Sequence, residues 1–79
     1  MDIEVRLFAT FRDYLPEGEK GFAVPVAFEG EKTAGSVLAD LGIPSDLPRI
    51  IVVEGSQVGE DYRVSDGDVI SVFPPLGGG

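Results

Sequence analysis

The sequence predicts an α+β domain of two layers, in which a mixed sheet of four to five strands packs against one main helix. Three observations support this prediction. Apolar residues alternate with a period of two near the start and the end of the chain, a helical spacing occurs in the middle, and glycine or proline separates the segments. Strands that precede and follow one helix are typical of a sheet covered on one face. The 79 residues leave room for a single domain, residues 1–79.

The first half of the chain predicts two strands. Residues 2–9 form the first, because Ile3, Val5 and Leu7 alternate with the positions between them. A short helical turn or loop is expected next, and a second strand over residues 21–28. Pro25 lacks an amide donor, so this strand is expected at an edge of the sheet, where one missing donor is tolerated.

A helix is predicted over residues 34–41, where apolar side chains recur at helical spacing. Thr33 is the expected N-cap, because its hydroxyl oxygen can accept a hydrogen bond from the first turn. Gly42 is expected just past the helix in the left-handed conformation, Ile43 folds back onto the last turn, and Pro44 prevents continuation. A helix of about two turns needs packing on the sheet to be stable.

The second half predicts the remaining strands. Residues 49–53 are apolar on both faces, so one face is expected to meet the core and the other a second covering surface. A short strand is expected around Val58, and Tyr62 is expected to point inward. The turn Asp66-Gly67-Asp68 then leads into the last strand, residues 69–73.

The composition excludes several classes of function. The absence of cysteine rules out disulfides, iron–sulfur clusters and thiol nucleophiles, and the absence of histidine removes the usual catalytic base and the ordinary zinc site. A net charge of −8 repels nucleic acid and favours a basic partner. No apolar run approaches the roughly 20 residues of a membrane span, and no signal-peptide pattern opens the chain, so a cytoplasmic protein without membrane contact is expected.

The last seven residues are the strongest functional signal. They read Phe73-Pro74-Pro75-Leu76-Gly77-Gly78-Gly79. The two prolines cannot donate ladder hydrogen bonds and fix φ at about −65°, so residues 74–79 are expected to form an extended, flexible tail. Glycines without side chains let the backbone enter a narrow site in another protein, where the carboxylate of Gly79 is the group that can be chemically modified. A frayed terminus without function is the alternative.

Three segments together resemble the MoaD/ThiS family of ubiquitin-like sulfur carriers. They are the first strand and turn at residues 5–15, the helix exit Leu41-Gly42-Ile43-Pro44, and residues 64–79, where an Asp-Gly-Asp turn, an apolar strand, a Phe-Pro-Pro exit and a terminal Gly-Gly occur together. The resemblance spans nearly the whole chain. It implies a ubiquitin-like β-grasp fold, in which the first and last strands pair in parallel at the centre of the sheet.

The resemblance also implies a mechanism. A ubiquitin-activating-like adenylyltransferase would use ATP to adenylate Gly79, and a sulfur donor would convert the acyl-adenylate into a thiocarboxylate. The carrier itself would bind no cofactor or metal and would supply no catalytic side chain. The tail residues expected to enter the partner's site are Pro74, Pro75, Leu76, Gly77 and Gly78.

The leading prediction for the acceptor is the large subunit of molybdopterin synthase, with this chain as the small subunit of that sulfurtransferase. The Phe-Pro-Pro exit favours this assignment. Gly77 departs from the usual residue before the terminal pair and also occurs in thiazole-forming carriers. Carriers for thiamine thiazole, cysteine, tungsten cofactor or tRNA thiolation therefore stay open. So do a ubiquitin-like modifier, joined to lysine by an isopeptide bond, and a binding module with an idle tail.

A partner-binding patch is expected on the sheet face opposite the helix. Phe8, Val69 and Phe73 are assigned to this face by alternation. Because the first and last strands are neighbours, Phe8 and Phe73 are expected to lie close together, beside one alternate set from residues 50–53. Exposed apolar patches mark interfaces, so we hypothesise that this patch docks the activating enzyme and the acceptor. Five residues are assigned to the helix side: Ile3, Val5, Leu7, Ile70 and Val72.

Overall fold

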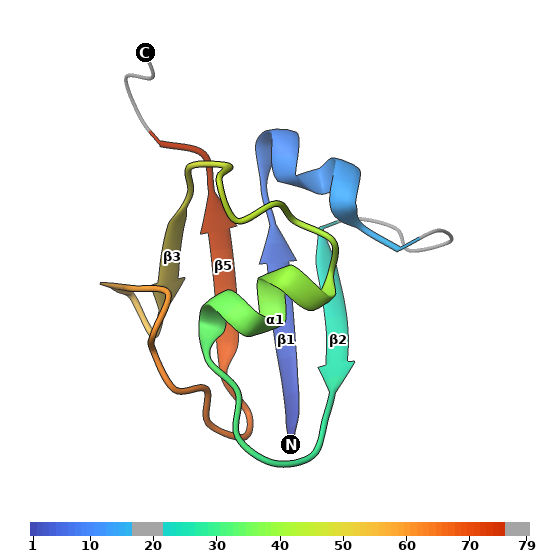
Figure 1. Ribbon diagram of the computed structural model, residues 1–79, viewed down its shortest axis with the longest axis vertical. Coiled ribbons are helices and arrows are strands. Elements are labelled where there is room, and N and C mark those ends of the chain that lie inside the picture. Colours follow the sequence, from blue (N-terminus) through green and yellow to red (C-terminus); the bar gives the residue numbers. More distant parts are fainter. Residues whose placement is uncertain (17–21, 76–79) are drawn as a thin grey trace.

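The computed structural model describes residues 1–16 and 22–75, and its strands form one five-stranded sheet in the order β2-β1-β5-β3-β4. The helix α1 crosses one face of this sheet (Figure 1). This arrangement confirms the predicted two-layer α+β architecture. In chain order the elements are β1 (Asp2–Leu7), the 3₁₀ helix η1 (Ala9–Tyr14), β2 (Ala23–Ala27), α1 (Ala34–Asp40), β3 (Ile50–Val53), β4 (Ser56–Val58) and β5 (Val69–Phe73).

The parallel pair β1 and β5 forms the centre of the sheet. Val5 pairs with Ile70 and Leu7 with Val72, while β2 runs antiparallel to β1 and β3 antiparallel to β5. Figure 1 shows β1 and β5 side by side behind α1, pointing in the same direction. The central parallel pairing that the family resemblance implied is therefore present. Its consequence for the site is that both strands end at the same edge of the sheet.

The strand β2 lies at an edge, as Pro25 predicted. Leu7 N donates to Phe22 O at 2.7 Å and Phe28 N donates to Met1 O at 3.0 Å, so the even-numbered residues of this strand bond to β1 in the alternating antiparallel pattern. Pro25 falls at an outward position, where no ladder bond to β1 is lost. Its missing amide also makes this edge a poorer template for pairing with another chain.

The helix α1 begins and ends as the sequence predicted, apart from one residue at its end. Ser36 N donates to the Thr33 hydroxyl at 3.2 Å, which makes Thr33 the N-cap. Gly42 adopts φ +89°, and Ile43 N donates back to Leu38 O at 3.2 Å, so Ile43 is buried against the last turn. No helix within the described ranges is long and apolar enough to cross a membrane.

The core lies between α1 and the inner face of the sheet. The five strand residues assigned to the helix side are all buried, and Tyr62 packs against the core as predicted. The 3₁₀ helix contributes one buried ring. The buried apolar residues of this core are Ile3, Val5, Leu7, Phe11, Ala34, Val37, Leu38, Ile43, Ile51, Val53, Val64, Ile70 and Val72.

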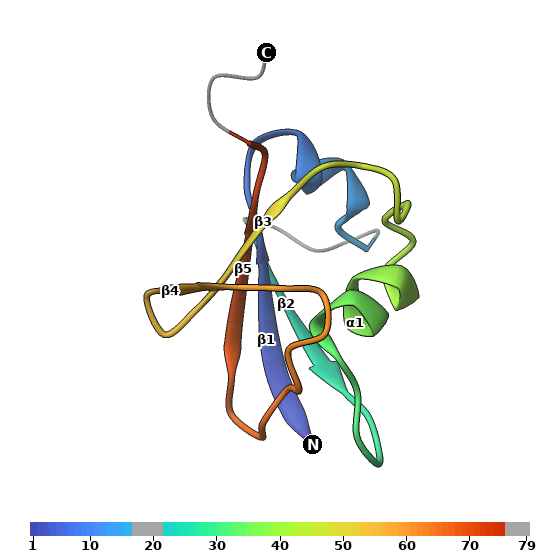
Figure 2. The same ribbon diagram turned by 60° about the vertical axis from the view of Figure 1, so that its left-hand side comes forward.

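Two predictions about the strands were wrong in part. Ile51 and Val53 are buried, but Ile50 and Val52 on the other face are only half-buried, and no second layer of described elements covers them. Figure 2 shows the sheet almost edge-on, with α1 on one side only. The first strand ends at Leu7 instead of Ala9, because Ala9 adopts φ +53° and turns the chain into η1.

A buried carboxylate fixes the turn that leads into β5. Asp68 is 7% exposed, and its Oδ2 accepts hydrogen bonds from Tyr62 Oη at 2.9 Å and Ser65 N at 2.8 Å. The backbone oxygen of Asp68 accepts from Glu4 N at 3.0 Å, which ties the turn to β1. The hydrogen bond to Asp68, with smaller contributions from desolvation and neighbouring charges, raises the pKa of Tyr62. This network fixes the turn from which β5 begins.

A second polar contact fastens the loop before β3. Arg49 is only 4% exposed at its side chain, and its guanidinium donates to Glu60 through Nε at 2.9 Å and Nη2 at 2.6 Å. Arg49 Nη1 also donates to Pro44 O at 2.8 Å. The hydrogen bond from Arg49 lowers the pKa of Glu60, although burial opposes the shift. A Cβ at Gly35 would lie 2.8 Å from Glu60 Oε1, so glycine there leaves room for this pair.

Candidate functional site

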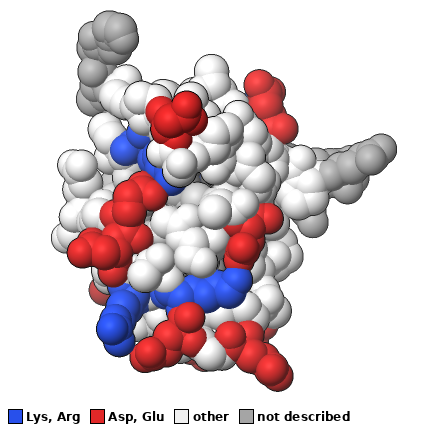
Figure 3. Space-filling view, viewed as in Figure 1, with Lys and Arg blue, Asp and Glu red and all other residues white. Residues whose placement is uncertain are grey.

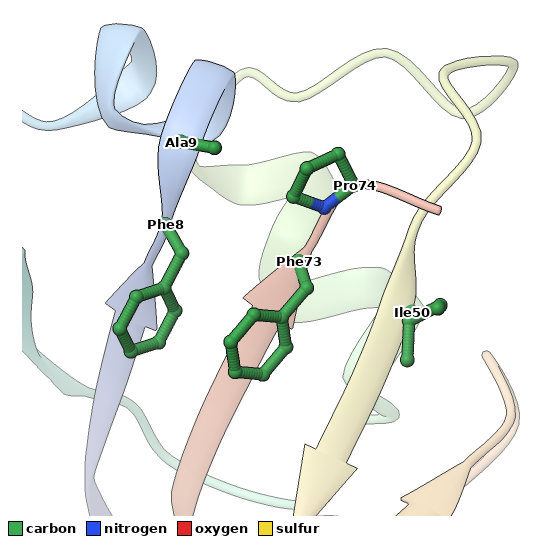
Figure 4. A pocket seen from close by; sticks show the side chains of 5 residues that line it. All are labelled: Phe8, Ala9, Ile50, Phe73 and Pro74. Carbon is green, nitrogen blue, oxygen red and sulfur yellow. The ribbon is translucent and has the colours of Figure 1, made fainter. Parts of the chain in front are cut away.

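The open face of the sheet carries a stacked aromatic pair. Phe8 follows β1 and Phe73 ends β5, and their ring centroids lie 4.5 Å apart with the planes 7° from parallel. Figure 4 shows the two rings side by side above neighbouring strands. The rings meet because β1 and β5 are parallel and end at the same edge. The predicted proximity of Phe8 and Phe73 is confirmed, whereas their role in binding a partner stays a prediction.

A shallow groove of about 420 Å³ opens beside this pair, and we call it the apical groove. Its volume lies within the range of about 300–1,000 Å³ that is typical of ligand pockets. The lining comes from the ends of β1 and β5 and the start of β3, as Figure 4 shows. All of the lining residues are apolar; they are Phe8, Ala9, Ile50, Phe73 and Pro74.

The rim of the groove at Ala9 has a backbone conformation that alanine does not favour, and contacts with the core hold it in place. Ala9 adopts φ +53°, a conformation that costs roughly 1 kcal/mol for a residue with a Cβ. Phe8 N donates to Val72 O and Phe11 N donates to Phe8 O, both at 3.1 Å. The ring of Phe11 is buried in the core. Burial of Phe11 therefore offsets the strain at Ala9.

Phe22 extends the aromatic surface toward β2, and the sequence analysis missed it. Its ring centroid lies 5.1 Å from that of Phe8, and the guanidinium carbon of Arg6 lies 6.0 Å from the Phe22 centroid. Phe22 is 43% exposed. Strict alternation with buried Val24 would have assigned Phe22 to the helix side. Its contact with Phe8 arises just before β2 begins, where strand alternation no longer governs the direction of the side chain.

Val69 lies apart from the groove. It starts β5 opposite Glu4, whereas Phe73 ends the same strand. Four residues of strand correspond to roughly 13 Å. The structure thus brings Phe8 and Phe73 together and leaves Val69 at the other end of the open face.

The charges are distributed unevenly over the molecule. At the open-face positions of the strands, the charged residues are Asp2, Glu4 and Arg6, all on β1, and Glu4 forms an ion pair with Arg6. Figure 3 has α1 in front and shows acidic groups spread over that side of the molecule. Most cations of the described part are already paired: the ion pairs are Arg6–Glu4, Lys32–Asp40, Arg49–Glu60 and Arg63–Glu31.

The predicted tail is only partly within the described residues. Pro74 is half-buried and lines the apical groove, and Pro75 is exposed. Leu76, Gly77, Gly78 and Gly79 lie outside the described residues. For metal binding, residues 1–16 and 22–75 contain no group of three or more His, Cys, Asp or Glu side chains placed to hold an ion.

Comparisons with known proteins agree with this geometry. The sequence model of a family described as Mut7-C ubiquitin matches residues 1–76. Small archaeal modifier protein 3 of Haloferax volcanii is 34% identical, with both chains covered completely. The crystal structure of SAMP1 from Haloferax volcanii aligns with a TM-score of 0.71 at 24% identity, over 100% of both chains.

A crystal structure of small archaeal modifier protein 1 from the same organism aligns with a TM-score of 0.72 at 23% identity, over 95% of this chain and 98% of that one. At these identities the two structures bear on the fold alone. They confirm the ubiquitin-like β-grasp that the resemblance implied.

Proposed function

Since the chain belongs to the Mut7-C ubiquitin family and has a ubiquitin-like fold of the MoaD/ThiS type, we propose that it is a carrier whose Gly79 carboxylate is activated with ATP. A carboxylate oxygen of Gly79 attacks the α-phosphorus of ATP on a ubiquitin-activating-like enzyme, and pyrophosphate leaves. Hydrosulfide released from a sulfur donor then attacks the acyl carbon and displaces AMP, and loss of the remaining proton gives a thiocarboxylate. ATP is bound by the activating enzyme and not by the carrier.

The composition supports chemistry at the terminus instead of within the fold. The chain has neither cysteine nor histidine, so it has no thiol nucleophile and no imidazole that could activate a serine as general base. A carboxylate is a poor electrophile until its oxygen becomes part of a good leaving group, and adenylation provides that group. The proposal requires Gly79 to bear a free carboxylate.

The observation that carries the proposal is that the apical groove lies at the root of the glycine tail. Pro74 lines the groove, and the sequence continues from it through Pro75 to Gly79. A partner that docks on Phe8 and Phe73 would hold this root beside its own surface. The five residues after Pro74 span at most about 18 Å when extended. The partner's reactive site must therefore lie within this distance of the docked groove.

We also propose which enzyme accepts the sulfur. The Phe-Pro-Pro exit favours delivery to the large subunit of molybdopterin synthase, where the thiocarboxylate would attack the pterin precursor. Carriers for thiamine thiazole, cysteine, tungsten cofactor or tRNA thiolation use the same terminal chemistry and differ only in the acceptor.

A second candidate function is that of a protein modifier. It is favoured by the name of the 34% identical relative, small archaeal modifier protein 3. In this case a lysine amine of a target attacks the activated Gly79 carbonyl and forms an isopeptide bond. Both candidates share the adenylated intermediate and differ in the nucleophile that follows.

Mass spectrometry separates the two candidates. The protein is incubated with the activating enzyme of its own organism, ATP, a sulfide source and a cell extract. Exchange of one terminal oxygen for sulfur supports the carrier. Target peptides whose lysine carries residues 64–79 of this chain, the fragment left after cleavage at Arg63, support the modifier. The matched control carries one extra alanine after Gly79 and should show neither product. If the wild-type protein also shows neither, the proposal is wrong.

A further inference from the structure

We infer that Asp66-Gly67, in the turn before β5, is a site of spontaneous isomerisation to isoaspartate, and that the backbone of Asp2 restrains this reaction in the folded protein. The turn lies at the opposite end of β5 from the apical groove. The inference goes beyond the proposed function and does not depend on it, since neither the groove nor the tail takes part.

Aspartate followed by glycine meets little steric resistance to this reaction, because glycine has no side chain beside the attacking nitrogen. The Gly67 amide nitrogen attacks Cγ of the Asp66 carboxyl group in its acid form and closes a succinimide ring. The carboxyl hydroxyl and the amide hydrogen leave together as one water. A second water then adds at the backbone carbonyl carbon of Asp66 and breaks its bond to Gly67 N. The chain is now linked through Cγ, and its mass is unchanged.

In the folded protein, the backbone of Asp2 holds both reacting groups. Gly67 N donates to Asp2 O at 2.8 Å, and Asp66 Oδ1 accepts from Asp2 N at 2.7 Å. The attacking nitrogen loses its hydrogen to solvent, and the carboxyl group turns until Cγ faces that nitrogen. The reaction therefore proceeds from a state in which both contacts with Asp2 are open.

The first two residues can open without unfolding the core. Met1 is 40% exposed and Asp2 is exposed, whereas Ile3 is only 5% exposed and anchors β1 in the core. Figure 1 shows this end of β1 at the lower edge of the sheet. Opening of residues 1–2 exposes little buried apolar surface, and such local openings require less free energy than global unfolding. The rate of isomerisation should follow the population of this local opening.

Isomerisation would loosen the turn that leads into β5. The backbone gains one atom between Ser65 and Asp68, which are joined by Asp68 N to Ser65 O at 3.0 Å and by Ser65 N to Asp68 Oδ2 at 2.8 Å. The free carboxylate also moves from Cβ to Cα of Asp66, away from its position opposite Asp2 N. We therefore expect the isomerised protein to unfold at a lower urea concentration than the unmodified one.

Incubation of matched variants tests the inference. Asp2→Pro removes the amide that donates to Asp66 and keeps the carbonyl, at the first residue of a strand, where proline is tolerated. Asp2→Ala is the matched control, because it changes the same side chain and the same charge and retains the amide. The wild-type protein, both variants and a synthetic peptide of residues 63–70 are incubated in the same buffer.

The product is measured in the tryptic fragment of residues 64–79, by its chromatographic shift and by labelled methylation with an isoaspartyl methyltransferase. The sequence contains one Asp-Gly dipeptide and no asparagine, so the signal reports on this site. The Asp66→Ala variant gives the background.

The wild-type protein and Asp2→Ala should isomerise at equal rates, and both more slowly than the peptide. Asp2→Pro should react about fivefold faster than Asp2→Ala, since the loss of one hydrogen bond shifts an opening equilibrium by about that factor. In the wild-type protein the rate should hardly change with urea below the unfolding transition, because opening two residues exposes little surface.

The inference is overturned if the wild-type protein isomerises as fast as the peptide, if Asp2→Pro and Asp2→Ala react at the same rate, or if the wild-type rate rises with urea as steeply as the unfolding equilibrium does. The peptide and urea comparisons use the wild-type chain, so they decide the question even if Asp2→Pro does not fold. No step involves the terminal carboxylate, so a failure here leaves the activation of Gly79 to the mass-spectrometric test.

Discussion

Replacing Asp68 with alanine is expected to lower the free energy of unfolding by about 3 kcal/mol, because a buried ionised acceptor with two hydrogen bonds is lost. Asp68 is 7% exposed, and its carboxylate accepts hydrogen bonds from Tyr62 Oη at 2.9 Å and Ser65 N at 2.8 Å. A domain of this size is stable by about 4–12 kcal/mol, so the loss is a large fraction of the total. The melting temperature should fall by roughly 12–24 °C.

Urea and thermal unfolding followed by circular dichroism measure this effect, and Asp66 offers a matched control. Asp66 lies two residues away, is exposed, and accepts one hydrogen bond from Asp2 N at 2.7 Å. Asp66→Ala should cost about 1 kcal/mol or less. Asp68→Ala could instead lower the free energy of unfolding by no more than Asp66→Ala does, with the same dependence on urea concentration in both variants. In that case the buried carboxylate does not hold the turn before β5.

The same contact predicts a dependence of stability on alkaline pH. The hydrogen bond to Asp68 is the main cause that raises the pKa of Tyr62. A group with a raised folded pKa contributes its full stability below its unfolded pKa, about 10 for tyrosine, and loses it as pH rises through the folded value. Wild-type stability should therefore fall above about pH 10. The decline should be weaker in Asp68→Ala, and an equal decline in both proteins would contradict the assignment.

Other contacts in the fold and at the site give three more predictions. Arg49 lowers the pKa of Glu60, so the stability that this pair contributes is present above the pKa of Glu60 in the unfolded chain and is lost as pH falls through its pKa in the folded protein. Glu60→Gln should lower the free energy of unfolding at pH 7 by only about 1 kcal/mol, because solvent screens the half-exposed Glu60. The variant's melting temperature should also fall less steeply in acid than that of the wild type. Gly35→Ala should destabilise the protein by about 1–2 kcal/mol in urea, although alanine has the better helix propensity. The added Cβ would lie 3.2 Å from the backbone oxygen of Glu60, which accepts a hydrogen bond from Gly35 N, and 2.8 Å from Glu60 Oε1, which Arg49 holds in place. Phe73→Asp should abolish binding of the activating enzyme in a calorimetric titration, while the variant still unfolds cooperatively. Val69→Asp should weaken binding less. If Val69→Asp weakens binding more than Phe73→Asp does, the enzyme docks near Val69 and not on the apical groove.

The elements that local chemistry determines could be predicted from the sequence. Thr33 caps α1, Gly42 ends it in the left-handed conformation, and Pro25 lies at the outward position of an edge strand. Alternation assigned Phe8 and Phe73 to one face, and the parallel pairing implied by the family resemblance put them side by side. In each case the chemistry of the residue restricts it to a few positions in a helix or strand.

Contacts between distant segments could not be predicted in the same way. Phe22 contacts Phe8 from a position just outside β2, where alternation no longer applies. The covering layer expected over Ile50 is not found among the described elements. The prediction failed because a strand that is apolar on both faces can also lie in a sheet whose second face is open. The Arg49–Glu60 pair spans two loops whose approach depends on the whole fold. Such pairings carry no local sequence signal.

The most direct test of the central claim is ATP–pyrophosphate exchange by the activating enzyme. We predict that the wild-type protein stimulates exchange, and that the protein with one alanine added after Gly79 does not, although both melt at the same temperature. Exchange that persists with the capped terminus would show that the Gly79 carboxylate is not the group that ATP activates.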